Sequence, residues 1–176
     1  MARQTGKTDS VADSCLILGD RYSRTQIGNI LIFGPREGQA ALDLDRMHER
    51  AEYRPYFNDI VDWKGSTKGT IVFKDKGTRF SREPGIIASQ ASASEMAHIE
   101  GFSAGTIVLE EAQRISDRVV SETILPMGGA WGARIIKVGT PRLRNHFYQS
   151  YVDPTYKQCI SPWEKCGLLN RYGAIS

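Results

Sequence analysis

The residues best suited to chemistry lie in two stretches that are far apart in the chain. The first, Gly6-Lys7-Thr8, has the form of a phosphate-binding loop. Glycine lets backbone N–H groups turn toward a phosphate, lysine reaches the outer phosphates, and a threonine hydroxyl can hold Mg²⁺. The tripeptide alone is a weak signal, because the full pattern also asks for a glycine where this chain has Met1.

The second stretch is the apolar run 106–109, which ends in the carboxylates Glu110 and Glu111. Because Mg²⁺ prefers oxygen ligands and keeps several waters, Thr8 and Glu110 are the candidate metal ligands. Glu111 is the candidate base that orients or deprotonates an attacking water. Adjacent acids at a strand end can also be ordinary solvent-facing charges. Together with the loop, however, they form the two halves of a site for nucleotide hydrolysis.

An amphipathic helix is predicted directly after the loop. Val11, Cys15 and Leu18 recur at helical spacing, and polar residues fill the other side. The positive end of such a helix faces the loop, where it favours a bound phosphate. The pair Gly19-Asp20 predicts the end of this helix.

The following segment favours an α/β fold. The continuous apolar run 29–33 is typical of a strand buried on both faces of a parallel sheet. A second helix is predicted after it, and its apolar face consists of Ala40, Leu44, Met47 and Ala51. The charged residues of this helix, Asp43 among them, are expected to point mostly outward.

Further strands and helices alternate along the rest of the chain. The predicted strands are 69–73 and 78–81, which flank a turn as a hairpin, then 86–89, 106–109 and 134–138. The predicted helices are 91–99 and a segment that begins at Ser116 or Asp117 and ends near Pro126 and Gly128-Gly129. This alternation predicts a three-layer α/β fold with a mostly parallel central sheet.

Composition indicates a soluble globular protein with one main domain. The chain has 176 residues, of which 40% are hydrophobic and 24% charged, and no apolar run is long enough for a membrane span. Its three cysteines form no C-x-x-C pair, so a reducing compartment, by default the cytoplasm, is expected. The core is predicted over residues 1–151. Residues 152–176 are predicted to be a poorly defined basic tail. The basic stretch 134–176 as a whole is either a phosphate-facing surface or a solvated basic face.

Four motifs, in this order, resemble those of the large terminase subunit, the ATPase motor that packages DNA into tailed-bacteriophage capsids. Residues 3–8, Arg-Gln-Thr-Gly-Lys-Thr, are similar to that family's variant of the phosphate loop. The strand and helix over 30–41 resemble its second strand and helix. Residues 110–113, Glu-Glu-Ala-Gln, resemble its D-E-A motif, and 139–141, Gly-Thr-Pro, its coupling motif. The resemblance runs from residue 3 to about residue 151.

The resemblance implies a P-loop NTPase domain of the RecA-like type that uses ATP and Mg²⁺. Residues Gln4, Thr5, Gly6, Lys7 and Thr8 would hold the triphosphate. Arg3 would stabilise the transferred charge, and Thr140 would sense the γ-phosphate. The implied partners are double-stranded DNA, the portal and the small terminase subunit, and the implied assembly is a homo-oligomeric ring in the host cytoplasm.

The chain also departs from the family. Glu110 stands where the family usually has aspartate, and the strand before the phosphate loop and the nuclease domain are expected to be missing. For that reason the chain by itself is expected to bind ATP weakly and to turn it over slowly. Two alternatives stay open: an inactive prophage remnant that folds or binds DNA without turnover, and a helicase-like or transposition ATPase.

Overall fold

A five-stranded sheet forms the middle layer of the protein. The structure is a computed structural model that describes residues 7–25, 28–74, 87–92, 104–140 and 142–160. The strands are β1 (Asn29–Gly34), β2 (Thr70–Val72), β3 (Ile87–Ser92), β4 (Ala104–Leu109) and β5 (Arg134–Lys137), and their order is β2-β3-β1-β4-β5. Strands β3, β1, β4 and β5 run parallel, whereas β2 is antiparallel to β3.

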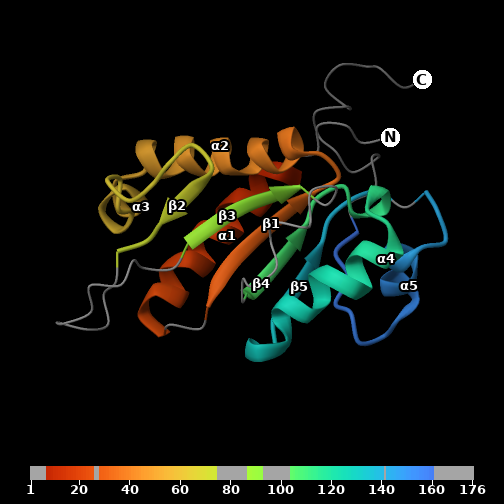
Figure 1. Cartoon of the computed structure of the whole chain (residues 1–176). Helices are drawn as coiled ribbons and strands as arrows, with labels where there is room; N and C mark the ends of the chain where they lie inside the picture. The colour runs from red at the N-terminus through yellow and green to blue at the C-terminus, as the bar shows by residue number, and fades with distance from the viewer. Residues whose placement is uncertain (1–6, 26–27, 75–86, 93–103, 141, 161–176) are drawn as a thin grey trace, which may run out of the picture.

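Helices cover both faces of this sheet (Figure 1). On one face lie α1 (Lys7–Thr25), α2 (Glu37–Tyr53) and α3 (Pro55–Ile60). On the other face lies a continuous helical segment formed by α4 (Asp117–Val119), a π-helical stretch η3 (Val120–Ile124) and a 3₁₀ stretch η4 (Leu125–Trp131). A short 3₁₀ turn η2 (Ala112–Arg114) follows β4, and α5 (His146–Val152) follows β5. The predicted three-layer α/β fold is confirmed.

Strand β1 shows why an uninterrupted apolar run belongs in the centre. Successive side chains of a strand point to opposite faces. Ile30 and Ile32 therefore pack with α1 and α2, while Leu31 and Phe33 pack against η3 and η4. All four side chains are almost fully buried. A polar side chain at any of these four positions would be buried against one of the two helical layers.

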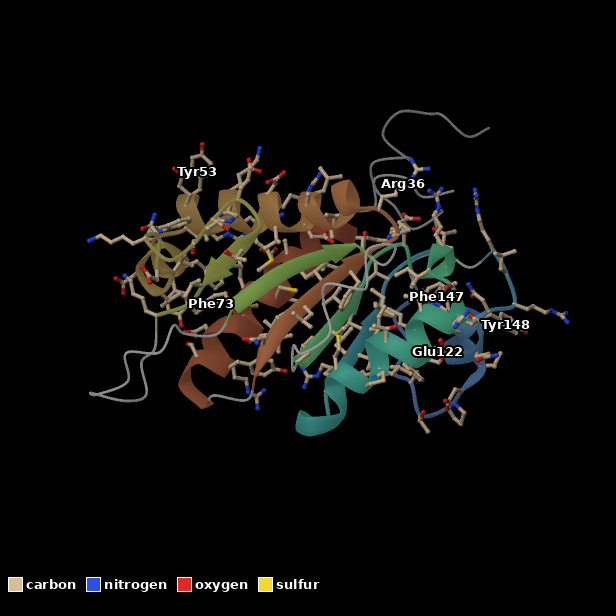
Figure 2. The ribbon with its side chains drawn as sticks, in the orientation of Figure 1. Arg36, Tyr53, Phe73, Glu122, Phe147 and Tyr148 are labelled. Atoms are coloured by element: carbon tan, nitrogen blue, oxygen red, sulfur yellow. The ribbon has the colours of Figure 1, made fainter. Side chains whose placement is uncertain are left out.

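Helix α1 is longer than the sequence predicts. It continues past Gly19-Asp20 to Thr25, so the predicted end was wrong. The reason is tertiary packing: a Cβ placed on Gly19 would lie 2.2 Å from the Phe73 ring, which fills the space beside this turn (Figure 2). Gly19 is thus a contact residue rather than a helix terminator.

Two other predicted boundaries also differ from the structure. The helical segment that starts at the N-cap Ser116 does not stop at Pro126, but continues as η4 to Trp131. Pro126 is the second residue of η4, at the junction where the π-helical stretch η3 ends and the 3₁₀ stretch begins. In the predicted helix 91–99, residues 91–92 belong to β3, and the rest lies outside the described residues, as does the predicted strand 78–81.

Candidate nucleotide-binding site

Three element ends meet at the carboxyl edge of the parallel strands. Helix α1 begins there with Lys7 and Thr8, Glu110 follows the last residue of β4, and Thr140 lies in the turn after β5. The hydroxyl of Thr8 donates to Oε1 of Glu110 over 3.5 Å. The ammonium of Lys7 donates to Oγ1 of Thr140 over 3.5 Å. Thr140, which would sense the γ-phosphate according to the resemblance, therefore lies beside Lys7.

The register of the sheet explains how residues so far apart in the chain come together. Phe33 of β1 pairs with Leu109 of β4, and Leu109 pairs with Lys137 of β5, so these strands end at the same level. At the opposite end of α1, the hydroxyls of Tyr22 and Thr106 lie 2.6 Å apart and are buried. This contact places the end of α1 beside the first half of β4. The beginning of α1 therefore lies at the carboxyl end of β4.

The carboxylate of Glu110 is buried and only partly hydrogen-bonded. It is only 7% exposed, and its Oε2 has no hydrogen-bond partner in the described part of the chain. Burial raises the pKa of Glu110, and the charge of Lys7 opposes that rise. A buried carboxylate oxygen without a partner is costly unless something else satisfies it. The residues present therefore fit a cation held by Thr8 and Glu110.

A cation at this position would not need a large protein cage. Among the described residues, no group of three or more histidine, cysteine, aspartate and glutamate side chains could hold a metal ion. Mg²⁺ is usually held by one or two carboxylates, with waters and substrate phosphates completing its octahedron. The site thus suits a metal that arrives with a nucleotide, rather than a metal that the protein holds alone.

Glu111 is held in an unusual backbone conformation. Its φ is 49° and its ψ is 42°, which lie in the left-handed region that residues other than glycine rarely adopt. Such a conformation costs about 1–3 kcal/mol and persists where the surrounding structure enforces it, often at functional sites. It turns the Glu111 side chain away from the strand direction at the point where β4 meets η2.

Gln113 is the residue of this site whose role the sequence did not predict. Its Nε2 donates to Oε2 of Glu111 over 2.6 Å, and its Oε1 accepts the backbone N–H of Thr140 over 3.2 Å. Gln113 is almost fully buried. A Cβ placed on Gly139 would lie 2.1 Å from Gln113 Oε1, so glycine is required there for this close approach. Only the motif 110–113 pointed to this residue, without a role.

Asp43 of α2 also lies near the site, against expectation. It was predicted to face outward with the other charged residues of its helix, and this was wrong, because it is fully buried. Burial, together with the charge of Glu110, raises the pKa of Asp43 to about 8. The apolar stripe of α2 is wide enough to enclose position 43, because α2 is covered by both α1 and the sheet.

Comparison with known proteins gives a structural match but no sequence match. No protein-family model and no curated protein matches the chain. Two structures of the ATPase domain of the large terminase of Thermus phage P74-26 align with TM-scores of 0.65 and 0.64, at 19% and 18% identity, over 85% of this chain and 61% of that domain. The large terminase of bacteriophage HK97 aligns with a TM-score of 0.58 at 19% identity, over 80% of this chain and 28% of that protein.

The chain has the fold of a large terminase ATPase domain. It spans less than two thirds of the length of these terminase structures. Within this terminase fold, the described residues that were predicted for the site are Lys7, Thr8, Glu110, Glu111 and Thr140. The other predicted site residues, Arg3, Gln4, Thr5 and Gly6, lie outside the described residues. None of the helices described in this terminase fold has the length and apolar content that crossing a lipid bilayer requires.

Proposed function

We propose that this chain is the ATPase motor domain of a viral DNA-packaging terminase, which couples ATP hydrolysis to the movement of double-stranded DNA. The observation that supports it most is the pair of contacts Thr8–Glu110 and Lys7–Thr140 at the carboxyl edge of the sheet. Open parallel sheets bind their ligands at that edge. A lysine, a hydroxyl and two carboxylates there are the parts that phosphoryl transfer to water needs from a protein.

In this proposal the first task of the site is to bind the triphosphate. Lys7 places its ammonium at the outer phosphates, and residues 4–8 surround them at the beginning of α1, where the helix dipole favours negative charge. Thr8 and Glu110 hold Mg²⁺, which, when bound, neutralises charge on the phosphates. Arg3 compensates the charge that develops during transfer.

The second task is hydrolysis. Glu111 orients a water and takes its proton while the water oxygen bonds to the γ-phosphorus and the bond to the bridging oxygen of ADP breaks. Gln113 fixes the Glu111 carboxylate through the 2.6 Å hydrogen bond. Because the same side chain accepts the Thr140 amide, a change at Thr140 when the γ-phosphate leaves would be transmitted to the base. That link is a route from hydrolysis to movement.

The proposed partners are those that the resemblance to the terminase family implies. They are double-stranded DNA, a portal, a small terminase subunit and further copies of the chain in a ring, in the cytoplasm of a host cell. The exposed basic residues 142, 144 and 157 near α5 form a surface that could meet DNA phosphates.

The test is a titration of fluorescently labelled ATP with Mg²⁺, followed by assays of phosphate release with and without double-stranded DNA. The matched variant is Lys7→Ala, with Lys68→Ala, an exposed lysine distant in sequence from the site, as the control. We expect Lys7→Ala to lose ATP binding and Lys68→Ala to keep it. Equal ATP affinity in all three proteins would overturn the proposed site. Binding without any turnover would favour the inactive remnant instead.

A further inference from the structure

Asp43 lies level with the first turn of α1. Arg46, three residues later on α2, pairs with Asp9 of α1, and Arg50 pairs with Asp13, so the two helices run side by side in the same direction. Three residues of helix span roughly 4.5 Å, which brings Asp43 to the height at which α1 begins. Asp43 points inward, because its side chain is fully buried whereas Arg46 is partly exposed.

The charge of Asp43 acts on the same carboxylate that Thr8 contacts. Its electrostatic neighbours are Glu110, Arg46 and the buried thiol of Cys15. Burial and the charge of Asp43 raise the pKa of Cys15 to about 12, so the thiol stays neutral and offers no countercharge. Arg46 is already paired with Asp9 at the surface. Without a further cation, burial and the charge of Glu110 therefore favour the neutral form of Asp43.

Three carboxylate oxygens of Asp43 and Glu110 have no hydrogen-bond partner among the described residues. Neither Oδ1 nor Oδ2 of Asp43 has a hydrogen-bond partner in the described part of the chain, and Oε2 of Glu110 has none either. Buried polar atoms in native proteins are nearly always paired, and a buried charge without a partner is more costly than a neutral group. Two ionised acids that repel each other are more stable with a further positive partner besides Lys7, whose charge acts on Glu110.

We propose that Asp43 is a second acidic group of the metal site of Thr8 and Glu110, and that both carboxylates face one hard divalent cation. This inference rests on the proposed function, because the cation is the one that would accompany ATP. Mg²⁺ and Mn²⁺ take oxygen ligands and fit one or two carboxylates. Asp43 contacts the cation directly or through one of its waters. With Asp43 as an additional acidic group, the metal is held near α1 more tightly than Glu110 alone would hold it.

The test measures binding of Mn²⁺ by electron paramagnetic resonance, with the free-ion signal as readout, on the chain alone and with ADP. The variants are Asp43→Asn, Asp43→Ala and Glu110→Gln, and the control is Asp45→Asn, an exposed acid on the same helix. We expect both Asp43 variants and Glu110→Gln to bind Mn²⁺ about 10–100-fold more weakly. Asp45→Asn is expected to bind as the parent does.

Thermal unfolding separates a metal role from a structural one. Without divalent ions, Asp43→Asn is expected to melt at the same temperature as the parent or higher, because it removes a buried carboxyl group whose ionisation burial disfavours. With Mg²⁺ and ADP, the parent is expected to gain stability and Asp43→Asn to gain less. Asp43→Ala keeps the test valid if Asp43→Asn does not fold.

The outcomes distinguish this inference from the proposed function. If Asp43→Asn binds Mn²⁺ as tightly as the parent while Glu110→Gln has lost affinity, Asp43 is only a buried acid and the inference is overturned, with the nucleotide site intact. A parent chain that binds no Mn²⁺ also overturns it. If the parent needs Asp43 for Mn²⁺ but binds no ATP, the metal site stands and the ATPase function fails.

Discussion

The side chain of Gln113 joins Glu111 to Thr140. One end of its amide donates to the Glu111 carboxylate over 2.6 Å, and the other end accepts the Thr140 N–H over 3.2 Å. The hydroxyl oxygen of Thr140 in turn accepts a hydrogen bond from the ammonium of Lys7 over 3.5 Å. The proposed base Glu111, the turn after β5 and Lys7 are therefore connected by consecutive hydrogen bonds. This connection gives each of the proposed roles a separate experiment.

Replacing Glu111 by Gln is expected to keep ATP binding and to lower turnover. The change preserves the shape of the side chain and removes the base, which contributes about 10²–10⁴-fold in typical enzymes. Phosphate release at saturating ATP, together with a labelled-ATP titration, measures the two effects. Turnover near the parent rate would show that Glu111 is not the base, and Glu110 would become the candidate.

Replacing Gln113 by Ala is expected to lower kcat by about 10–100-fold while KM changes little, because the carboxylate of Glu111 loses the donor that orients it. Steady-state ATP hydrolysis measures both constants. Gln149, which is exposed on α5, supplies the control Gln149→Ala, and we expect that variant to behave as the parent. A rise in KM with an unchanged kcat would mean that Gln113 acts in binding and not on the base.

Replacing Gly19 by Ala is expected to destabilise the fold by about 1–3 kcal/mol, because the added methyl group overlaps the Phe73 ring and the core must shift. Gly38 of α2 is the matched control, since a Cβ there meets nothing within 4 Å. Gly38→Ala is expected to raise stability slightly, as alanine is the better helix former. Urea unfolding monitored by circular dichroism gives both free energies. Equal midpoints for the two variants would contradict the packing account of α1.

Lowering the pH below 6.5 is expected to reduce stability through His146. Burial lowers the pKa of His146 from its ordinary value of 6.5, and the charge of Lys137 lowers it further, against the opposing effects of the hydrogen bond to Ile115 and the charge of Asp117. Between that lowered value and 6.5 the unfolded chain binds the proton more readily, so the free energy of unfolding falls as the pH falls through this window. Above 6.5 this contribution is fully present.

The matched variant for the pH prediction is His146→Gln. Glutamine can still donate to the carbonyl of Ile115, which His146 Nε2 approaches at 3.2 Å. Free energies of unfolding measured in urea from about pH 5 to about pH 7.5 should rise with pH more steeply in the parent than in His146→Gln. Identical slopes in the two proteins would assign the pH dependence to other groups.

Local patterns in the sequence were sufficient for the layers and for most of the site. A continuous apolar run such as 29–33 can be satisfied only in the interior of a sheet, and Ser116 before a helical stretch is a capping residue wherever it stands. Glu110 and Thr140 each follow a strand directly. Because parallel strands end at one edge, the sequence also implied that these residues would meet the beginning of α1, and their contacts with Thr8 and Lys7 agree.

Tertiary packing decided the features that depend on a distant partner. Position 19 of α1 is a glycine because the ring of Phe73, the residue that follows β2, occupies the space that a side chain at position 19 would need. Asp43 is buried because α1 and the sheet cover α2 on two sides, and no periodicity within α2 reports on its neighbours. Gln113 reaches both Glu111 and Thr140 because β5 pairs with β4 and brings its following turn against η2. The residue types of the site are local properties of the chain, whereas burial and hydrogen-bond partners arise only when segments far apart in the sequence come into contact.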